Sequence, residues 1–223
     1  MDRRVFVINL KNYAEIMGES ALLLATTAEL VSAQVDVDII VAPPVPSLAA
    51  IAEKVSIPII SQKVDDSVEG KSTGAVIPEA LSAWGCAGSL INHAEARIPL
   101  DSISRLVPRM KSLNLISCVC VQKADELVSV AASGPEYIAV EPPELIGTGV
   151  SVSRARPELV SDSVRAAERA GYGGKVLCGA GIVSGDDVKR AVELGAKGIL
   201  VASSLVKADD WNAKMKELAS ALL

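Results

Sequence analysis

The stretch KVLCGAGIVSGDDVKRAVELGAKGILVASS, residues 175–204, decides the fold class. Its two ends, KVLCG and GILVA, are short runs rich in Val, Ile and Leu, which are typical of strands buried on both faces. The segment between them, 184–195, has the spacing of a helix, with Ser184 placed as N-cap and Gly195 just past the end. A strand, a helix and a second strand in this order predict parallel strands joined by a crossover helix.

The same alternation recurs along the whole chain. Eight strand-like runs are predicted, each followed by a helix-like segment, and eight such units close naturally into a (β/α)8 barrel. An open doubly wound sheet is the competing architecture, but it usually carries G-x-G-x-x-G after the first strand, where this chain reads NLKNYAEIMG. We therefore predict an α/β protein with one (β/α)8 barrel domain over residues 1–223. The predicted strands are 5–9, 37–42, 57–61, 88–92, 115–121, 137–141, 175–179 and 198–202, and the clearest helices are 20–34, 156–171, 184–195 and 209–223.

Composition narrows the classes of function. Half of the 223 residues are hydrophobic but only 3% are aromatic, so the interior must be built from Val, Ile, Leu and Ala. The net charge is −5 without a basic stripe, which argues against nucleic acid as a partner. No apolar run approaches the roughly 18 residues of a membrane span, and the N-terminal apolar run is too short for a signal peptide. We expect a soluble cytoplasmic protein with no membrane partner.

The four cysteines, Cys86, Cys118, Cys120 and Cys178, indicate neither a disulfide nor a metal site. Cys118 and Cys120 lie two apart in an apolar run, so in a strand they face the same side and are hard to bridge. No histidine or second cysteine pair stands near them in sequence. We expect reduced, mostly buried thiols.

Polar and glycine-rich residues follow five of the predicted strands. The C-terminal ends of barrel strands meet around one mouth, where active sites lie. Taken singly, each residue has a structural explanation, such as a hydrogen-bonded histidine, an ion-paired glutamate, a surface lysine or a closely packed glycine. Their coincidence at corresponding strand ends predicts one functional site. The residues are Asn9 and Lys11, His93 and Glu95, Glu141, CGAG at 178–181 and ASS at 202–204.

These motifs resemble those of the triosephosphate isomerase family, in the short form typical of archaeal enzymes, and the resemblance covers essentially the whole chain. NLK at 9–11 matches the family's N-x-K, and HAE at 93–95 matches its H-x-E. EPPELIGTG at 141–149 matches the lid motif and is the most specific match. The chain differs where the family usually has Y-G-G-S after strand seven, G-G after strand eight and a Trp in the lid. The shorter matches are APP at 42–44 and Thr73-Gly74, and the differences are CGAG at 178–181, Ala202-Ser203 and Glu144.

The resemblance implies a TIM barrel that interconverts dihydroxyacetone phosphate and glyceraldehyde 3-phosphate through an enediolate. It implies that Glu141 is the base and that His93, as a neutral imidazole, is the electrophile. Lys11 would supply positive charge, Asn9 would help to hold it in place, and Glu95 would orient it. No metal or organic cofactor is required. The implied substrate-binding residues are Asn9, Lys11, Ile146, Gly147, Gly179, Ala180, Gly181, Ala202 and Ser203.

The resemblance also implies self-association as a homodimer or homotetramer, with Thr73 of the third loop supporting Lys11 of another subunit. Two other functions stay open on the residues alone. One is a different phosphate-binding barrel enzyme, which residues 178–205 would suit equally well. The other is a catalytically silent phosphosugar-binding or scaffold protein on the same fold.

Overall fold

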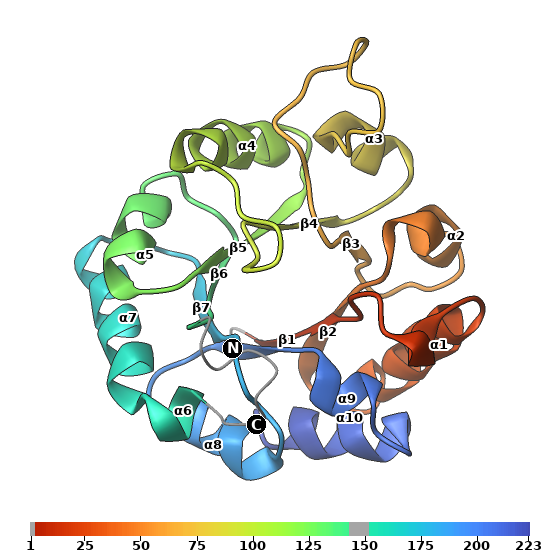
Figure 1. The fold of residues 1–223 in the computed structure, drawn as a ribbon. Helices are drawn as coiled ribbons and strands as arrows, with labels where there is room; N and C mark the ends of the chain where they lie inside the picture. The colour runs from red at the N-terminus through yellow and green to blue at the C-terminus, as the bar shows by residue number, and fades with distance from the viewer. Residues whose placement is uncertain (1–2, 143–151) are drawn as a thin grey trace.

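The computed structural model describes residues 3–142 and 152–223. Within these residues, eight parallel strands form one sheet in the order β2-β1-β8-β7-β6-β5-β4-β3. Figure 1 looks along the resulting barrel, with the helices in a ring outside the strands. The strands are β1 (Arg4–Asn9), β2 (Val37–Ala42), β3 (Ile60–Ser61), β4 (Gly88–Ile91), β5 (Ile116–Val121), β6 (Tyr137–Val140), β7 (Lys175–Cys178) and β8 (Gly198–Val201).

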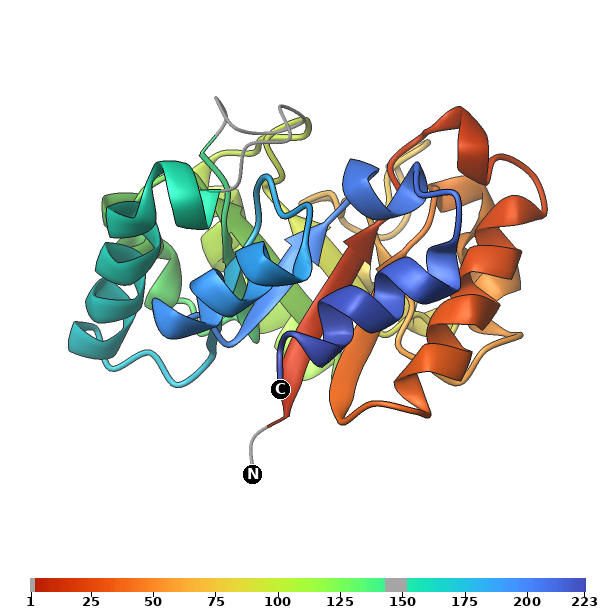
Figure 2. The same ribbon diagram turned by 90° about the horizontal axis from the view of Figure 1, so that it is seen from below.

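Helices connect each strand to the next, as the sequence predicts. Figure 2 shows the barrel from the side. The C-terminal helices lie in front of the strands, and β1, in red, runs from one end of the barrel to the other. The α-helices of the described residues are α1 (Ser20–Ser32), α2 (Leu48–Ala52), α3 (Pro78–Ala83), α4 (Leu100–Ser112), α5 (Ala124–Ala131), α6 (Val152–Ala155), α7 (Pro157–Arg169), α8 (Gly185–Glu193), α9 (Ser203–Val206) and α10 (Trp211–Ser220). Two short 3-10 helices, η1 (Ala14–Ile16) and η2 (Val45–Ser47), lie in the loops after β1 and β2.

The sheet closes between β2 and β3, which excludes the open doubly wound alternative. Val41 forms a parallel bridge with Ile59, and its N–H donates to the carbonyl oxygen of Pro58 at 3.1 Å. The predicted strand 57–61 is correspondingly too long, because regular pairing with β4 covers only Ile60–Ser61. Pro58 has no N–H to donate to a neighbouring strand, so the ladder cannot extend through it.

The core has two layers separated by the strands. Alternate residues of each strand face opposite sides, so Val5 and Val7 point into the barrel while Phe6 and Ile8 face the surrounding helices. Cys118 and Cys120 share the interior side, as their spacing predicts. All four cysteines are free and buried. The remaining members of the interior layer include Ile40, Ala42, Ile60, Leu90, Tyr137, Ala139, Leu177 and Leu200.

The predicted helix ends agree closely with the structure. Ser184 caps α8 in a reciprocal capping box with Asp187, and Gly195 follows the helix at φ +98°. Pro157 stands in the first turn of α7, and Gly171 follows that helix at φ +67°. None of the helices that the structure describes is long and apolar enough to cross a membrane.

Candidate active site

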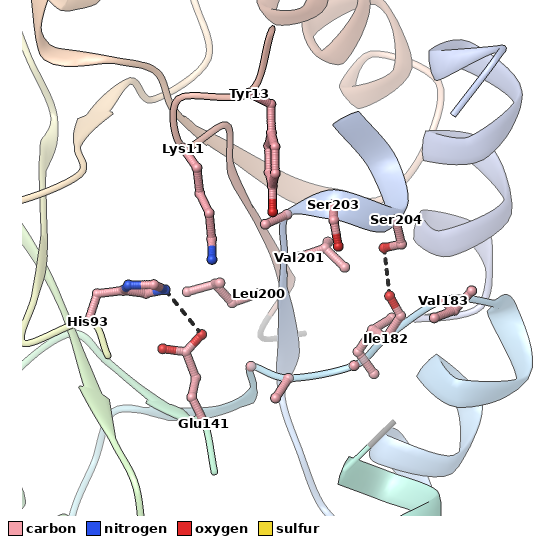
Figure 3. Close-up of a pocket in the computed structure, with 14 residues that line it drawn as sticks. Lys11, Tyr13, His93, Glu141, Ile182, Val183, Leu200, Val201, Ser203 and Ser204 are labelled. Atoms are coloured by element: carbon pink, nitrogen blue, oxygen red, sulfur yellow. Dashed lines mark hydrogen bonds and ion pairs between the residues drawn. The ribbon is translucent and has the colours of Figure 1, made fainter. Parts of the chain in front are cut away.

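The carboxyl ends of the strands bring together side chains that are far apart in sequence. Figure 3 shows the Lys11 ammonium, the His93 ring and the Glu141 carboxylate converging on one space. The loops after β7 and β8 line the same pocket from the opposite side. A second hollow, which shares Lys11 and His93 with the first, includes Asn9 and Glu95. The mouth of the barrel therefore brings together those predicted site residues that the structure describes.

Lys11 is held in place by hydrogen bonds to its backbone and by an ion pair of its side chain. Its φ of +48° is unusual for a non-glycine residue. Asn9 Oδ1 accepts a hydrogen bond from the Lys11 N–H at 3.0 Å, and Gln62 Nε2 donates to the Lys11 carbonyl oxygen at 2.9 Å. Gln62 also donates to the carbonyl oxygen of Ala42, which ties the first loop to the second. The Lys11 Nζ reaches Glu95 Oε1 at 2.6 Å.

His93 is a neutral imidazole with one defined tautomer. Its Nδ1 accepts a hydrogen bond from the Glu95 N–H at 3.1 Å, so the ring proton resides on Nε2. Nε2 faces Glu141, with 3.7 Å between it and Oε1. Burial, together with the positive charge of Lys11, lowers the pKa of His93 to about 4. The ring therefore presents an N–H donor to the pocket at neutral pH.

Glu141 directly follows β6, and its side chain is almost fully buried. Its N–H donates to the carbonyl oxygen of Val121 at 2.8 Å, which places it beside the end of β5. Burial raises the pKa of Glu141 to about 7, while contact with Cys120 and the charge of Lys11 offset part of the rise. Among the described residues, Glu141 Oε2 has no hydrogen-bond partner. A buried carboxylate with one unsatisfied oxygen is a stronger base than an exposed one.

Gly179 leaves room for this carboxylate. A Cβ built on Gly179 would lie 2.4 Å from Cγ of Glu141, closer than two carbon atoms can approach. The first glycine of CGAG is thus required sterically, because any side chain there would collide with Glu141. Its N–H donates to the carbonyl oxygen of Val140, which keeps the loop after β7 against the end of β6.

The loops after β7 and β8 are tied to each other. Ser204 Oγ donates to the carbonyl oxygen of Ile182 at 2.6 Å, as drawn in Figure 3. Asp187 Oδ2 accepts from the N–H groups of Val183 and Ser184, which fixes the end of the first loop on α8. Small residues with accessible N–H groups can hold a phosphate without many cations. The predicted phosphate residues on this wall are Gly179, Ala180, Gly181, Ala202 and Ser203, of which Gly179 already donates its N–H to the carbonyl oxygen of Val140.

Tyr13 and Gln62 are neighbours of the site that were not predicted. Tyr13 lines both hollows, and Lys207 Nζ lies 4.9 Å from the centre of its ring. Gln62 donates a hydrogen bond to the carbonyl oxygen of Lys11 beside the pocket. Gln62 follows the third predicted strand, so its position at a strand end was a usable signal. Two predicted residues, Ile146 and Gly147, lie outside the described residues, as does Glu144.

No group of three or more His, Cys, Asp or Glu side chains that could hold a metal ion is found in residues 3–142 and 152–223. The polar groups of the mouth are instead an ammonium, an imidazole and two carboxylates, from Lys11, His93, Glu95 and Glu141. These groups can exchange protons and stabilise negative charge without a metal.

The fold and its mouth define the class: a (β/α)8-barrel enzyme with its polar groups at the carboxyl ends of the strands. A model of the triosephosphate isomerase family matches residues 4–219. The chain is 45% identical over 218 residues to a triosephosphate isomerase of Methanothermus fervidus, covering 98% of each chain. It is 46% identical over 218 residues to one of Cenarchaeum symbiosum, covering 98% of this chain and 97% of the relative. A third, from Methanocaldococcus jannaschii, is 45% identical over 214 residues, covering 96% of this chain and 98% of the relative.

The chain belongs to the triosephosphate isomerase family, and its relatives are isomerases. The family match extends over nearly every strand and helix, not only over the phosphate loops. This favours an isomerase over the other phosphate-binding barrel enzymes and over a catalytically silent scaffold.

Proposed function

We propose that the protein interconverts dihydroxyacetone phosphate and glyceraldehyde 3-phosphate through an enediolate. Glu141 removes a proton from the carbon beside the carbonyl group and returns it to the neighbouring carbon. His93 donates its Nε2–H to the carbonyl oxygen as negative charge develops there. Lys11 supplies positive charge next to the same oxygen and to the phosphate.

One observation carries the proposal: a neutral imidazole N–H and a buried carboxylate face the same pocket. His93 Nε2 and Glu141 Oε1 lie 3.7 Å apart, so both can contact adjacent atoms of one small substrate. An imidazolium is a much stronger acid than an enediol, whereas a neutral imidazole is a weak acid, as an enediol is. A neutral ring can therefore share its hydrogen with the enediolate oxygen without a mismatch in acidity. The loops after β7 and β8 line the same pocket, where backbone N–H groups can bind a substrate phosphate.

Glu95 and Asn9 act on Lys11 and not on the substrate carbon. The Glu95 carboxylate is 59% exposed and pairs with Lys11 Nζ, while Asn9 fixes the Lys11 backbone. Because one partner of this pair is largely exposed, we expect the pair to contribute little to stability, and we assign it an orienting role.

The experiment is isomerisation of glyceraldehyde 3-phosphate in deuterated water, comparing the parent with Glu141→Gln. The parent should turn over substrate and incorporate solvent deuterium at the exchanged carbon. Glu141→Gln should lose roughly 10²–10⁴-fold in turnover while still binding glycerol 3-phosphate, because only the positioned base is removed. Near-normal turnover by the variant would contradict the assignment of the base.

We further propose that the protein self-associates as a homodimer or homotetramer through its third loop. Figure 1 shows the segment between β3 and α3 reaching beyond the ring of helices. Arg105 pairs with Asp66, and Arg109 donates to the carbonyl oxygen of Ser67, so α4 supports the base of this segment. Val68, within this segment, is 72% exposed. Thr73 would then approach Lys11 of another subunit. Light scattering of the active protein tests this, and a fully active monomer would contradict it.

A further inference from the structure

Asn92, the residue before His93, has an unusual environment. It is 2% exposed and adopts φ +63°, in the left-handed region that non-glycine residues seldom occupy. This backbone conformation ends β4 and turns the chain so that His93 enters the mouth. Glycine would meet the backbone requirement alone. The asparagine side chain must therefore be explained by what it contacts.

The side chain of Asn92 makes three hydrogen bonds. Oδ1 accepts from the N–H of Ile98 at 3.1 Å, which spans the loop that contains His93 and Glu95. Nδ2 donates to the carbonyl oxygen of Cys120 at 2.9 Å and to Glu126 Oε1 at 3.2 Å. One amide thus closes the loop after β4 upon itself and fastens it to the end of β5.

The end of β5 also holds the proposed base. Val121, the residue after Cys120, accepts the hydrogen bond from the Glu141 N–H at 2.8 Å. Asn92 and Glu141 are therefore attached to consecutive carbonyl groups of one strand. The imidazole and the carboxylate reach the pocket from two sides of this shared support.

Glu126 makes the anchor rigid. Its Oε2 accepts from the N–H of Gln122 at 2.8 Å, which fixes it at the start of α5. Its Oε1 receives Arg97 as well as Asn92, so a charged group from the same loop reinforces the bond. Glu126 is only partly exposed, which preserves the strength of these bonds.

We propose that Asn92 is a positioning residue that sets the separation between His93 and Glu141. The inference rests on the proposed function, because the separation matters only if the two side chains act on one substrate. Without the amide, the loop after β4 keeps its backbone turn but loses its attachment to β5. The His93 ring then shifts relative to the carboxylate, and displacement of a catalytic group by about 1 Å can cost roughly 100-fold in rate.

The test compares Asn92→Gly with Asn114→Gly. Asn114 has φ +56° and is exposed after α4, so both substitutions place glycine at a left-handed position. The cost of glycine to the unfolded chain is common to the two variants. Asn92→Gly alone also removes three hydrogen bonds beside the site.

Asn92→Gly should lower kcat by roughly 10- to 100-fold, while KM and inhibition by glycerol 3-phosphate change by about twofold or less. Asn114→Gly should retain the parent's kcat. If Asn92→Gly is less stable but turns over like Asn114→Gly below its melting temperature, the residue is merely structural and the inference is wrong. A parent without isomerase activity would instead contradict the proposed function.

Should Asn92→Gly fail to fold, Glu126→Gln decides. A glutamine has the same size, but its NH2 group must face one of the groups that now donate a hydrogen bond to Glu126, so that bond is lost. The variant should lose kcat without losing affinity for glycerol 3-phosphate. Unchanged kcat in a folded Glu126→Gln would overturn the inference.

Discussion

His93 Nε2 lies 3.7 Å from Glu141 Oε1, and yet the two side chains do not form an ion pair. An ion pair would raise the pKa of the histidine and lower that of the glutamate. The shifts run in the opposite directions, to about 4 and about 7, because burial disfavours charge on both groups. Lys11 provides the positive charge of the site instead. A neutral donor and a basic carboxylate therefore coexist at neutral pH.

The first prediction concerns the dependence of kcat/KM on pH. On our proposal that Glu141 acts as a carboxylate base, kcat/KM should fall as pH drops below about 7, the pKa to which burial raises this group. Because the pKa of His93 is lowered to about 4, titration of this ring should not change kcat/KM at pH values well above 4. The substrate phosphate also titrates, at a pKa of roughly 6. Inhibition by glycerol 3-phosphate over the same pH range measures that effect separately. A profile of kcat/KM that merely follows the inhibitor would argue against Glu141 as the titrating base.

The second prediction concerns Lys11. Lys11→Met should weaken binding of glycerol 3-phosphate and also lower kcat, because one ammonium serves both the phosphate and the enediolate oxygen. Glu95→Gln, which leaves the ammonium in place but removes its charged partner, should have the smaller effect on kcat. Steady-state kinetics of the two variants, with inhibition constants, provide the comparison. Unchanged inhibitor affinity in Lys11→Met would contradict a role of Lys11 in binding the phosphate.

The third prediction concerns Gly179. The added methyl of Gly179→Ala would approach Cγ of Glu141 to 2.4 Å, so the carboxylate must move. We expect a drop of roughly 10- to 100-fold in kcat, as for other small displacements of a catalytic group. Gly173→Ala is the matched control, because a Cβ there meets nothing within 4 Å. Equal kcat in the two variants would mean that the carboxylate tolerates the displacement.

The strand ends were predictable from the sequence because parallel strands in a barrel must deliver their carboxyl ends to one mouth. Lys11, His93 and Glu141 could be assigned to one site on that ground before any distance was known. The φ values of Lys11 and Asn92 were not predictable, because they depend on partners such as Gln62 and Cys120 that the chain reaches only after folding.

Other features depended on contacts across the barrel. Gly179 was expected to bind substrate, and only the approach of Glu141 shows why a side chain is excluded at this position. The length of β3 was overestimated, because apolar character begins at Ile57 while regular pairing with β4 covers only Ile60–Ser61. Periodicity records burial, whereas the ladder also requires N–H groups that face a neighbour.

The last prediction concerns the free energy of unfolding. The pKa of Glu141 is raised from its ordinary value of 4.5 to about 7 in the folded protein. Between these two pH values the folded state binds a proton that the unfolded state releases, so stability falls as pH rises. The stabilising contribution is fully present below about pH 4.5 and is lost once pH exceeds about 7.

Glu141→Gln has no such proton to lose, so its stability relative to the parent should improve with rising pH. The expected improvement is about 3 kcal/mol between pH values below 4.5 and above 7, from the size of the pKa shift. The pKa of His93 is governed by burial, Lys11 and Glu95, so its titration is common to both proteins and cancels in the difference. Denaturant unfolding of parent and variant at a series of pH values measures this difference directly. A difference that stays constant with pH would mean that Glu141 titrates alike in the folded and unfolded states, and its role as a base of raised pKa would be lost.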